Sequence, residues 1–378
     1  MEWKEVRLGD IATMQYGKLA PKKKDAGNVP IFTGYKNVGY TDKINCNKNT
    51  IVVVARGVGG CGDVKITNED CYLTNLAISV SLNAQICVPM FFYYLHQLEN
   101  LSILNSGSAQ PQITIESLTK YSFRIPSLDD QRRIVTVLSS LDRKIELNNK
   151  INADLEEMAQ AIFKNWFVEF EPFKDGKFVD SELGMIPEGW KVGRLTEIAS
   201  YMNGLAMQKF LPENDEDSLP VLKIKELGQG FCGPDSDRCS CNIKDECKIH
   251  NGDVIFSWSG TLLVDVWCGG DCGLNQHLFK VTSKDYPKWF YYYWTKHHLQ
   301  EFIHIAKDKA VTMGHIKRGH LEEALVAIPD NDSMERAHEL FEPILSKMIS
   351  LRMENSRLSL LRDTLLPRLM SGEIEIPE

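Results

Sequence analysis

The sequence predicts a mixed α/β protein made of two similar halves, each followed by one long helix. Mainly apolar residues recur at alternating steps of four and three along residues 134–166, and the same stripe returns 203 residues later, along residues 337–369. This spacing is typical of a helix that packs along its length against another helix. We therefore predict a pseudo-twofold internal repeat whose two long helices form a coiled coil.

The two stripes match position by position. The first comprises Ile134, Leu138, Leu141, Ile145, Asn148, Asn152, Leu155, Ala159, Ile162 and Trp166. The second comprises Ala337, Phe341, Ile344, Met348, Leu351, Asn355, Leu358, Arg362, Leu365 and Leu369.

Shorter matches support the repeat. An offset of 187 relates Trp3, Leu8, Ile11 and Gly17 to Trp190, Leu195, Ile198 and Gly204. The aromatic run at residues 89–94 returns at residues 287–292, and the Ile-Pro pair at 125–126 returns at 328–329. An offset that drifts in this way indicates loop insertions on a common fold.

Each half shows the same order of elements. In the first half we predict strands at residues 50–55 and 76–82, a glycine-rich turn at 57–62, an aromatic helix from Pro89 to about 101, and a loop at 105–112. In the second half we predict strands at 253–258 and 278–282, a helix at 287–303, and a loop at 307–315. The aromatic rows have the spacing of core residues; stacking on flipped bases is the alternative.

The first long helix is predicted to begin near Asp129 and to end near Phe167. The second contains Pro343 and Pro367, which predicts a bend or a shorter helix. The predicted divisions are residues 1–126 (first domain), 127–170 (first long helix), 171–189 (linker), 190–329 (second domain) and 330–378 (second long helix and tail).

Composition sets the class of protein. A length of 378 residues, 43% hydrophobic and 25% charged, predicts a globular protein of two or three domains. The start of the chain does not resemble a signal peptide, and its apolar runs are too short for a membrane span. Ten unpatterned cysteines then predict free thiols in the cytoplasm. The net charge is −8, but residues 1–126 carry 13 Lys and Arg against 10 Asp and Glu, so a local DNA-binding face is compatible.

Motifs for catalysis are missing from the sequence. There is no Pro-Pro dipeptide of the kind expected in an amino-methyltransferase motif, and the glycine-rich turn lacks the Gly-Lys-Ser/Thr of a phosphate-binding loop. The six cysteines between 232 and 272 lack paired zinc-ligand spacing except at Cys268 and Cys272, which favours core thiols over zinc. We predict a chain without catalytic residues, metal or cofactor.

Several motifs resemble those of type I restriction–modification specificity (S) subunits. They are the runs at residues 158–167 and 184–190, Ile-Pro-Ser-Leu-Asp-Asp-Gln-Arg-Arg at 125–133, Gly-Leu-Asn-Gln-His-Leu at 273–278, and the segment at 361–374. The resemblance covers essentially the whole chain. The second helix departs from the pattern, because it begins Asp-Asn-Asp-Ser-Met-Glu-Arg without the Gln-Arg-Arg of the first.

The resemblance implies a function and a set of partners. It implies two target-recognition domains that read a split double-stranded DNA site, held apart by an antiparallel coiled coil. It implies docking of two modification (M) subunits and, in some complexes, restriction (R) subunits. Those partners would carry the N6-adenine methyltransferase and ATP-dependent endonuclease activities, together with S-adenosylmethionine, ATP and Mg²⁺.

The helix length agrees with this implication. Residues 134 to 166 span about 48 Å of helix at about 1.5 Å per residue, compared with about 34 Å for one turn of B-DNA. Asparagine in a helix seam lowers stability but disfavours wrong registers. Antiparallel packing would bring Asn148 to the level of Asn355, and parallel packing would bring Asn152 there; placing two domains at opposite ends favours the antiparallel arrangement.

DNA contacts require cations for phosphates and amides, imidazoles, hydroxyls or guanidinium groups for base edges. In the first half the candidates are Lys18, Lys22, Lys23, Lys24, Arg56, Gln110 and Gln112. In the second half they are Ser257, Trp258, Gln276, His277, Lys309, Thr312, His315, Lys317 and Arg318. For the lysine run a solvated loop is the alternative, and for Arg56 a structural ion pair.

Two other classes of protein remain possible on the residues alone. A two-domain reader with its own catalytic site would modify or cut DNA without partners. A coiled-coil adaptor that holds two protein-binding domains would show no preference among DNA sequences.

Overall fold

The computed structural model describes residues 2–22, 27–57, 60–106, 111–213, 217–308 and 314–376. The chain divides into two compact units: unit 1 contains residues 1–143 and 359–378, and unit 2 contains residues 144–358. None of the described helices combines the length and the hydrophobicity that a membrane span requires.

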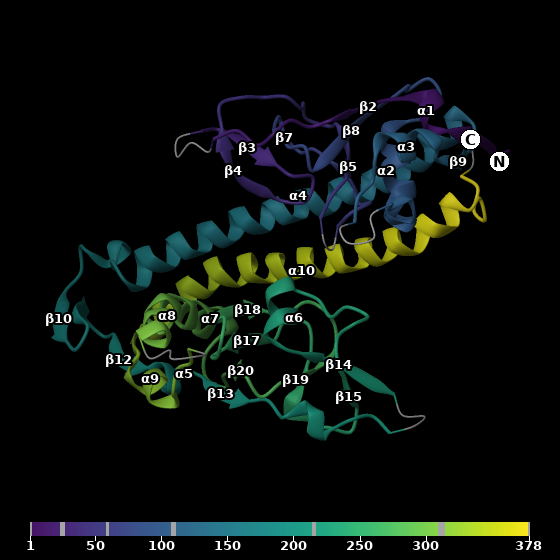
Figure 1. Ribbon diagram of the computed structural model, residues 1–378. Helices are drawn as coiled ribbons and strands as arrows, with labels where there is room; N and C mark the ends of the chain where they lie inside the picture. Colours follow the sequence, from purple (N-terminus) through teal and green to yellow (C-terminus); the bar gives the residue numbers. More distant parts are fainter. Residues whose placement is uncertain are drawn as a thin grey trace. The chain divides into compact units, whose positions relative to one another are not determined.

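Unit 1 contains a four-stranded antiparallel sheet, a three-stranded sheet and a separate strand pair (Figure 1). The first sheet has the order β2 (Ala12–Tyr16), β8 (Ala77–Leu82), β5 (Ile51–Val54) and β6 (Val64–Ile66). The second has the order β4 (Asn37–Thr41), β3 (Val29–Phe32) and β7 (Tyr72–Leu73), and the pair joins β1 (Lys4–Arg7) to β9 (Ser122–Ile125). The β-branched run of β5 is buried at every position, which explains why this strand occupies the interior of its sheet.

Short helices complete unit 1: α1 (Leu8–Ile11), α2 (Pro89–Leu98), the 3-10 helix η1 (Leu101–Leu104) and α3 (Ile115–Lys120). Pro89 lies at the first helical position of α2, where its missing N–H costs nothing. Thr114 caps α3, because its hydroxyl accepts a hydrogen bond from the Ser117 N–H at 3.1 Å. The aromatic residues of α2 enter the core of unit 1, as predicted.

Unit 2 repeats this strand order with additions. Its four-stranded antiparallel sheet has the order β13 (Ser200–Asn203), β20 (Leu278–Thr282), β17 (Val254–Ser257) and β18 (Leu263–Val266). A second sheet has the order β15 (Arg238–Ser240), β14 (Ser218–Leu222), β19 (Cys272–Leu274) and β16 (Lys248–Ile249), and a pair joins β12 (Lys191–Arg194) to β21 (Leu325–Ile328). The predicted strands at 50–55, 76–82, 253–258 and 278–282 are confirmed to within two residues at each end.

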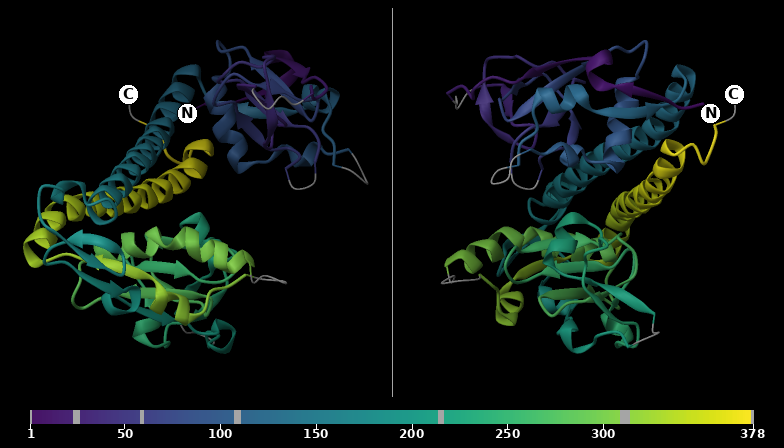
Figure 2. Two further views of the ribbon diagram at one scale, coloured as in Figure 1. Left: turned by 90° about the vertical axis from the view of Figure 1, so that its left-hand side faces the viewer. Right: turned by 45° about the vertical axis from the view of Figure 1, so that its right-hand side comes forward.

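The helices of unit 2 are α5 (Leu195–Ile198), η3 (Met207–Lys209), α6 (Ile224–Gln229), η4 (Asp245–Cys247), α7 (Lys288–His297), α8 (Leu299–Asp308) and α9 (Arg318–Glu323). The aromatic helix α7 packs on β18 and β20 (Figure 2). Its residues from Trp289 to Trp294 are buried. The prediction of one helix at 287–303 is wrong. The helix is interrupted at His298, whose Nε2 lies 2.8 Å from the Leu325 carbonyl oxygen, and α8 continues to Asp308.

The long helices are α4 (Leu128–Phe167) and α10 (Asn331–Met370), each of 40 residues. The sequence predicts a bent or a shorter second helix, and the shortening is wrong. Pro343 and Pro367 both lie inside α10, where a proline costs about 3 kcal/mol. Packing offsets this cost, because the helix buries Phe341 and Leu345 in the core of unit 2 and Leu366 and Leu369 in the core of unit 1.

Polar contacts join α4 to α10 within unit 2, where the two helices lie side by side (Figure 1). The Asn148 side-chain amide donates to Asn355 Oδ1 at 2.9 Å and to Glu354 Oε2 at 2.8 Å. Asn355 in turn donates to Asn149 at 2.8 Å. Asn152 is also buried, but its amide has no hydrogen-bond partner among the described residues.

The segment predicted as a linker has its own structure in unit 2. It contains the 3-10 helix η2 (Glu171–Phe173) and an antiparallel hairpin of β10 (Phe178–Ser181) and β11 (Gly184–Pro187). Gly184 adopts a φ of +83°, which favours glycine at this turn.

Candidate nucleic-acid interface

In unit 1, four loops meet at one end of the four-stranded sheet. Backbone hydrogen bonds join them: the Lys18 N–H donates to the Leu73 carbonyl at 3.0 Å, the Ala55 N–H to the Leu76 carbonyl at 2.8 Å, and the Ile113 N–H to the Ala55 carbonyl at 2.9 Å. These bonds hold the loops that follow β2, β5, β7 and η1 as one cluster, which we call loop cluster 1.

Unit 2 makes the same bonds at the same end of its sheet. The Leu205 N–H donates to the Leu274 carbonyl at 2.9 Å, the Trp258 N–H to the His277 carbonyl at 3.4 Å, and the Ile316 N–H to the Trp258 carbonyl at 3.1 Å. We call this arrangement loop cluster 2. The shared pattern makes Ala55 equivalent to Trp258 and Leu76 equivalent to His277.

In each loop cluster, one position requires glycine for a steric reason. A Cβ atom at Gly17 would lie 2.2 Å from the Thr74 carbonyl oxygen, and one at Gly204 would lie 2.2 Å from the Leu274 carbonyl oxygen. Only glycine allows the chain after β2 or β13 to pass so close to the neighbouring backbone. This explains why Gly17 and Gly204 recur in the sequence repeat.

Loop cluster 1 contains several of the predicted contact residues. Lys18, Lys22 and Arg56 are exposed, and no described acidic side chain forms an ion pair with any of them. Arg56 pairs with Gln112 in an isolated antiparallel bridge, and the Gln112 N–H donates to Asn105 Oδ1 at 2.7 Å. The predicted residues Lys23, Lys24 and Gln110 lie outside the described residues.

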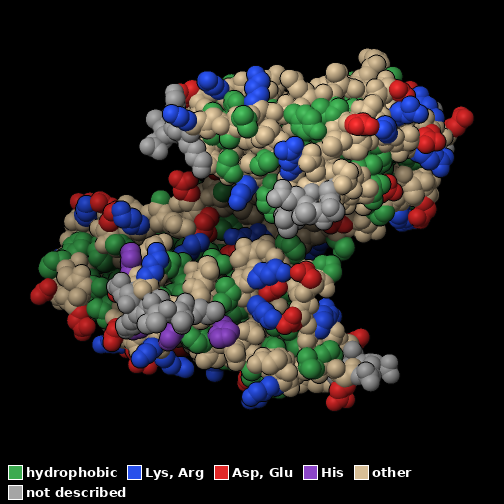
Figure 3. Space-filling view, in the orientation of Figure 1, with side chains coloured by type: hydrophobic (Ala, Val, Ile, Leu, Met, Phe, Trp, Pro, Cys, Tyr) green, Lys and Arg blue, Asp and Glu red, His purple; other side chains and the backbone are tan. Residues whose placement is uncertain are grey.

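Loop cluster 2 brings together Trp258, Gln276, His277 and His315. Trp258 donates from Nε1 to Asn203 Oδ1 at 3.1 Å, and its ring lies 5.9 Å from that of His277 and 6.4 Å from that of His315. Gln276 Nε2 lies 3.3 Å from His277 Nε2. Among the described residues, nothing bonds to the buried His277 Nδ1. Histidine and basic side chains share one visible face of unit 2 (Figure 3).

Ser257 differs from the expected position. It is fully buried, and its hydroxyl donates to the Thr261 carbonyl at 2.7 Å, so it fixes the turn after β17 instead of facing solvent. The residue equivalent to Arg56 is Ser259, because Ser259 pairs with His315 as Arg56 pairs with Gln112. The expectation that Ser257 fills the analogous place is therefore wrong.

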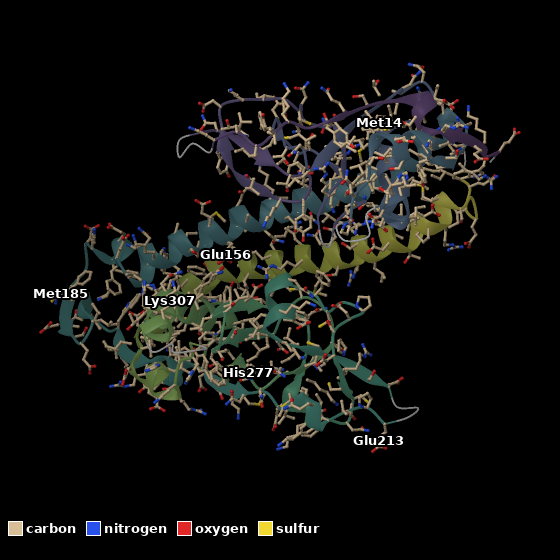
Figure 4. The ribbon with its side chains drawn as sticks, viewed as in Figure 1. Met14, Glu156, Met185, Glu213, His277 and Lys307 are labelled. Atoms are coloured by element: carbon tan, nitrogen blue, oxygen red, sulfur yellow. The ribbon has the colours of Figure 1, made fainter. Side chains whose placement is uncertain are left out.

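The remaining predicted residues of unit 2 lie near the same loop. Lys317 and Arg318 are exposed at the start of α9, and the Lys317 N–H donates to His320 Nδ1 at 3.1 Å. Lys309 and Thr312 lie outside the described residues. A hollow of about 280 Å³ borders this region and is lined by Gly260, Leu262, Ile303 and Lys307, among others. Figure 4 marks His277 and Lys307 within unit 2.

Two candidate residues were missed in the sequence. Tyr35 is 60% exposed in the turn between β3 and β4, and its ring lies against Gly60 of the glycine-rich turn. Asn203 ends β13 and orients Trp258. Neither belongs to a recognisable motif; an aromatic residue directly after glycine, in a turn, was the only available signal for Tyr35.

All ten cysteines are free thiols. Cys46 and Cys71 oppose each other in an antiparallel bridge, and a hydrogen bond from Cys71 lowers the pKa of Cys46 to about 7. A hydrogen bond with Cys232, followed by burial, raises the pKa of Cys272. Within the described ranges, no group of three or more His, Cys, Asp or Glu side chains is placed to hold a metal ion.

Comparisons with known proteins identify the family. The model of the type I restriction modification DNA specificity domain matches residues 1–157 and 187–348. The MjaIX specificity subunit of Methanocaldococcus jannaschii is 30% identical over 77% of this chain and 70% of its own length. The HindI specificity subunit of Haemophilus influenzae is 23% identical over 99% of this chain and 100% of its own.

A solved structure shares the fold. The S subunit of a type I restriction–modification system from M. genitalium superposes with a TM-score of 0.60 at 18% identity, covering 97% of this chain and 96% of that one. The family model covers well over half of the residues, in two separate stretches. The chain therefore belongs to the type I restriction–modification DNA specificity domain family.

Proposed function

We infer that this chain is the DNA sequence-specificity subunit of a type I restriction–modification complex. The observation that carries this conclusion is that the specificity-domain model matches two separate stretches, residues 1–157 and 187–348. Two recognition domains on one chain suit a bipartite DNA target. The subunit is non-catalytic, and the catalytic activities of the complex lie in its partner subunits.

We propose that residues 1–126 and 190–329 are the two target-recognition domains. Residues 127–170 and 330–378 contain the spacer helices, joined to the second domain by residues 171–189. The hydrogen bond between Asn148 and Asn355 supports antiparallel packing of the spacer helices, because parallel packing would oppose Asn152 to Asn355 instead. A pseudo-twofold relation of the halves is supported by the common strand order.

Loop clusters 1 and 2 are the proposed DNA-reading surfaces. In the first, Lys18, Lys22, Lys23 and Lys24 would bind phosphates, and Arg56, Gln110 and Gln112 would reach base edges. In the second, the proposed contacts are Trp258, Gln276, His277, Lys309, Thr312, His315, Lys317 and Arg318, while Ser257 supports the turn. Amide and guanidinium groups can each make paired hydrogen bonds to adenine and guanine edges, which suits a sequence-reading role.

The proposed partners are double-stranded DNA and two modification subunits, with restriction subunits as further members. S-adenosylmethionine, ATP and Mg²⁺ would be bound by those partners. The M subunits would carry N6-adenine methylation, and the R subunits would carry ATP-dependent cleavage.

The decisive experiment is methylome sequencing of cells that carry this chain with its neighbouring modification subunit, compared with cells that carry either alone. The expected result is a methylated split motif with a fixed unread gap that appears only with both. Exchanging residues 1–126 for those of a relative should change one half of the motif and leave the other half unchanged. A stable complex without any such motif would contradict the proposed function.

A further inference from the structure

The aromatic ring of Tyr35, in the turn between β3 and β4, lies against the glycine-rich turn of loop cluster 1. Its side chain is 60% exposed, whereas the aromatic residues Phe91 and Phe92 of the same unit are fully buried. An exposed ring loses apolar burial worth about 2 kcal/mol, so its surface position calls for an explanation.

The turn that carries Tyr35 is tightly fixed. The Thr33 hydroxyl accepts hydrogen bonds from the Tyr35 N–H at 3.3 Å and the Lys36 N–H at 3.0 Å, and the Thr33 N–H donates to the Lys36 carbonyl at 3.1 Å. Gly34 has a φ of +84°, and a Cβ there would lie 2.8 Å from the Ala77 Cβ. The backbone is thus preorganised, which lowers the entropic cost of using the ring as a contact.

The ring lies between the glycine-rich turn and a hollow. A Cβ at Gly60 would lie 2.9 Å from Tyr35 Cδ2, so the ring rests directly on the glycine-rich turn that follows Arg56. The ring also borders a hollow of about 300 Å³, which Phe32, Asn37 and Asn68 help to line. Tyr35 is therefore supported against the protein while much of its surface faces outward.

The surroundings carry charges of both signs, because Lys36 and Glu69 both line the hollow beside the ring. Lys18, Lys36 and Arg56 are exposed in this part of unit 1, and no described carboxylate forms an ion pair with them. Cations around a rigid exposed aromatic ring form the combination used for nucleic acids, in which cations bind phosphates and the ring stacks on a base. A neutral apolar partner would gain nothing from these charges.

We propose that Tyr35 stacks on a nucleobase of the half-site read by unit 1. A duplex offers a base face only where a step is opened, so the ring would act at a locally unstacked step. The contact would add affinity to the first half-site and leave the second unaffected. This inference rests on the proposed function and adds a contact that hydrogen-bonding residues do not supply.

The test uses the complete complex with its modification subunits and the split target found by methylome sequencing. Binding is measured by fluorescence anisotropy at one fixed salt concentration. Tyr35→Leu keeps apolar bulk but removes the planar ring, and Tyr35→Phe keeps the ring but removes the hydroxyl. We expect Tyr35→Leu to weaken binding about tenfold, and Tyr35→Phe to stay within about twofold, since stacking of one base contributes about that much.

Tyr40→Leu is the matched control. Tyr40 is also exposed, but it lies within β4 opposite Pro30 and outside the turn. Tyr40→Leu should change the affinity for the split target by no more than about twofold. Scrambling the half-site read by unit 1 should remove the difference between wild type and Tyr35→Leu.

The possible results distinguish failure of the stacking contact from failure of the proposed function. If wild-type complex binds its split target and Tyr35→Leu binds equally well, the stacking contact is refuted while the proposed function stands. If Tyr35→Phe is as weak as Tyr35→Leu, the hydroxyl carries the contact and stacking is again refuted. If the wild-type complex shows no preference for any sequence, the proposed function itself fails.

Discussion

Loop clusters 1 and 2 have equivalent backbone hydrogen bonds but different exposed side chains. Equivalent hydrogen bonds hold the loops in both, including those from Ile113 to Ala55 and from Ile316 to Trp258. Cluster 1 presents long cationic side chains, and the exposed ring of Tyr35 lies against its glycine-rich turn. Cluster 2 presents the indole of Trp258, which lies beside the imidazoles of His277 and His315. The scaffold is fixed by backbone bonds, so side chains at the loops can differ without altering the fold.

The two units also differ at one buried position of their cores. Within the repeated aromatic run, His96 of α2 occupies the place that Trp294 occupies in α7. His96 is 3% exposed; its Nδ1 lies 2.7 Å from the Phe92 carbonyl oxygen and its Nε2 lies 3.2 Å from the Tyr121 hydroxyl. Unit 1 thus buries a titratable group where unit 2 buries an indole.

The largest expected effect is acid destabilisation of unit 1 through His96. Burial lowers the pKa of His96 to about 4, compared with about 6.5 in an unfolded chain. The unfolded chain therefore binds more protons between these values, and the free energy of unfolding falls as the pH falls from about 6.5 to about 4, by about 3 kcal/mol in total. His96→Phe should remove this part of the pH dependence.

Hydrogen exchange measured at pH 7 and pH 5 would locate the effect. Amides of α2 and β9 should lose protection at the lower pH in the wild type and should lose less in His96→Phe. Helix α7 cannot serve as the reference, because burial also lowers the pKa of its His297 to about 4. Identical pH dependence in wild type and His96→Phe would contradict the assignment.

The next effect concerns Arg56, which has no equivalent cation in cluster 2, where Ser259 stands. If Arg56 binds a guanine edge with two hydrogen bonds, Arg56→Ala should weaken binding of the cognate target by about 2 kcal/mol, or about 30-fold. It should also relax the methylated motif at one position of the first half-site. Arg124→Ala, an exposed arginine on β9, is the matched control and should leave the motif unchanged. A uniform loss across all sequences would show a phosphate contact instead.

A smaller effect, on the free energy of unfolding, is expected at the contacts between α4 and α10, which differ between the two units. In unit 1, Arg362 pairs with Asp142 at 2.9 Å, whereas in unit 2 Asn148 bonds to Asn355. Asn148→Leu should lower the free energy of unfolding by about 1 kcal/mol, because the partly exposed Glu354 and Asn355 side chains of α10 each lose a hydrogen bond. Asn152→Leu should raise it, since the Asn152 amide has no described partner to lose. Urea unfolding of the two variants compared with wild type tests the opposite signs.

The smallest effect is expected at Trp258. Trp258→Phe keeps an aromatic ring but loses the solvent-exposed hydrogen bond from Nε1 to Asn203, worth about 0.5 kcal/mol. Binding should weaken only a few-fold, and only for the second half-site. Methylation rates on targets mutated in one half-site at a time would measure this weakening. If Trp258→Phe changed recognition of both half-sites equally, a local role of Trp258 would be disproved.

Much of the fold follows from sequence periodicity. The runs at β5 and β17 are apolar and β-branched, and the stripes of α4 and α10 persist for ten positions, so these elements are recognisable without a structure. The break at His298 and the second sheet of unit 2 were not recognisable. The break depends on a carbonyl of β21, distant in sequence, and strands β14 to β16 lie in an acidic, cysteine-rich stretch with no clear alternation.

Less of the candidate site than of the fold could be predicted from the sequence. The repeat indicated Trp258, Gln276 and His277, but it also indicated Ser257, which is buried. The equivalent of Arg56 is Ser259, because the register of the turn after β17 is set by backbone bonds to His277 and His315. Tyr35 could not be found, since its exposure depends on packing against Gly60. The contacts with DNA remain predictions for all of these residues.

The division of the chain has a consequence for biosynthesis. Unit 2 is continuous in sequence, from residue 144 to 358, whereas the core of unit 1 includes Leu366, Leu369 and Met370 from the end of α10, and Gly372 lies against Trp3. As the ribosome extends the chain, unit 2 can bury its core before unit 1 has received its last apolar side chains. The segment before residue 144 therefore completes its core only after the end of α10 has been made, and a nascent chain stalled before residue 359 would expose an apolar surface that favours chaperone binding.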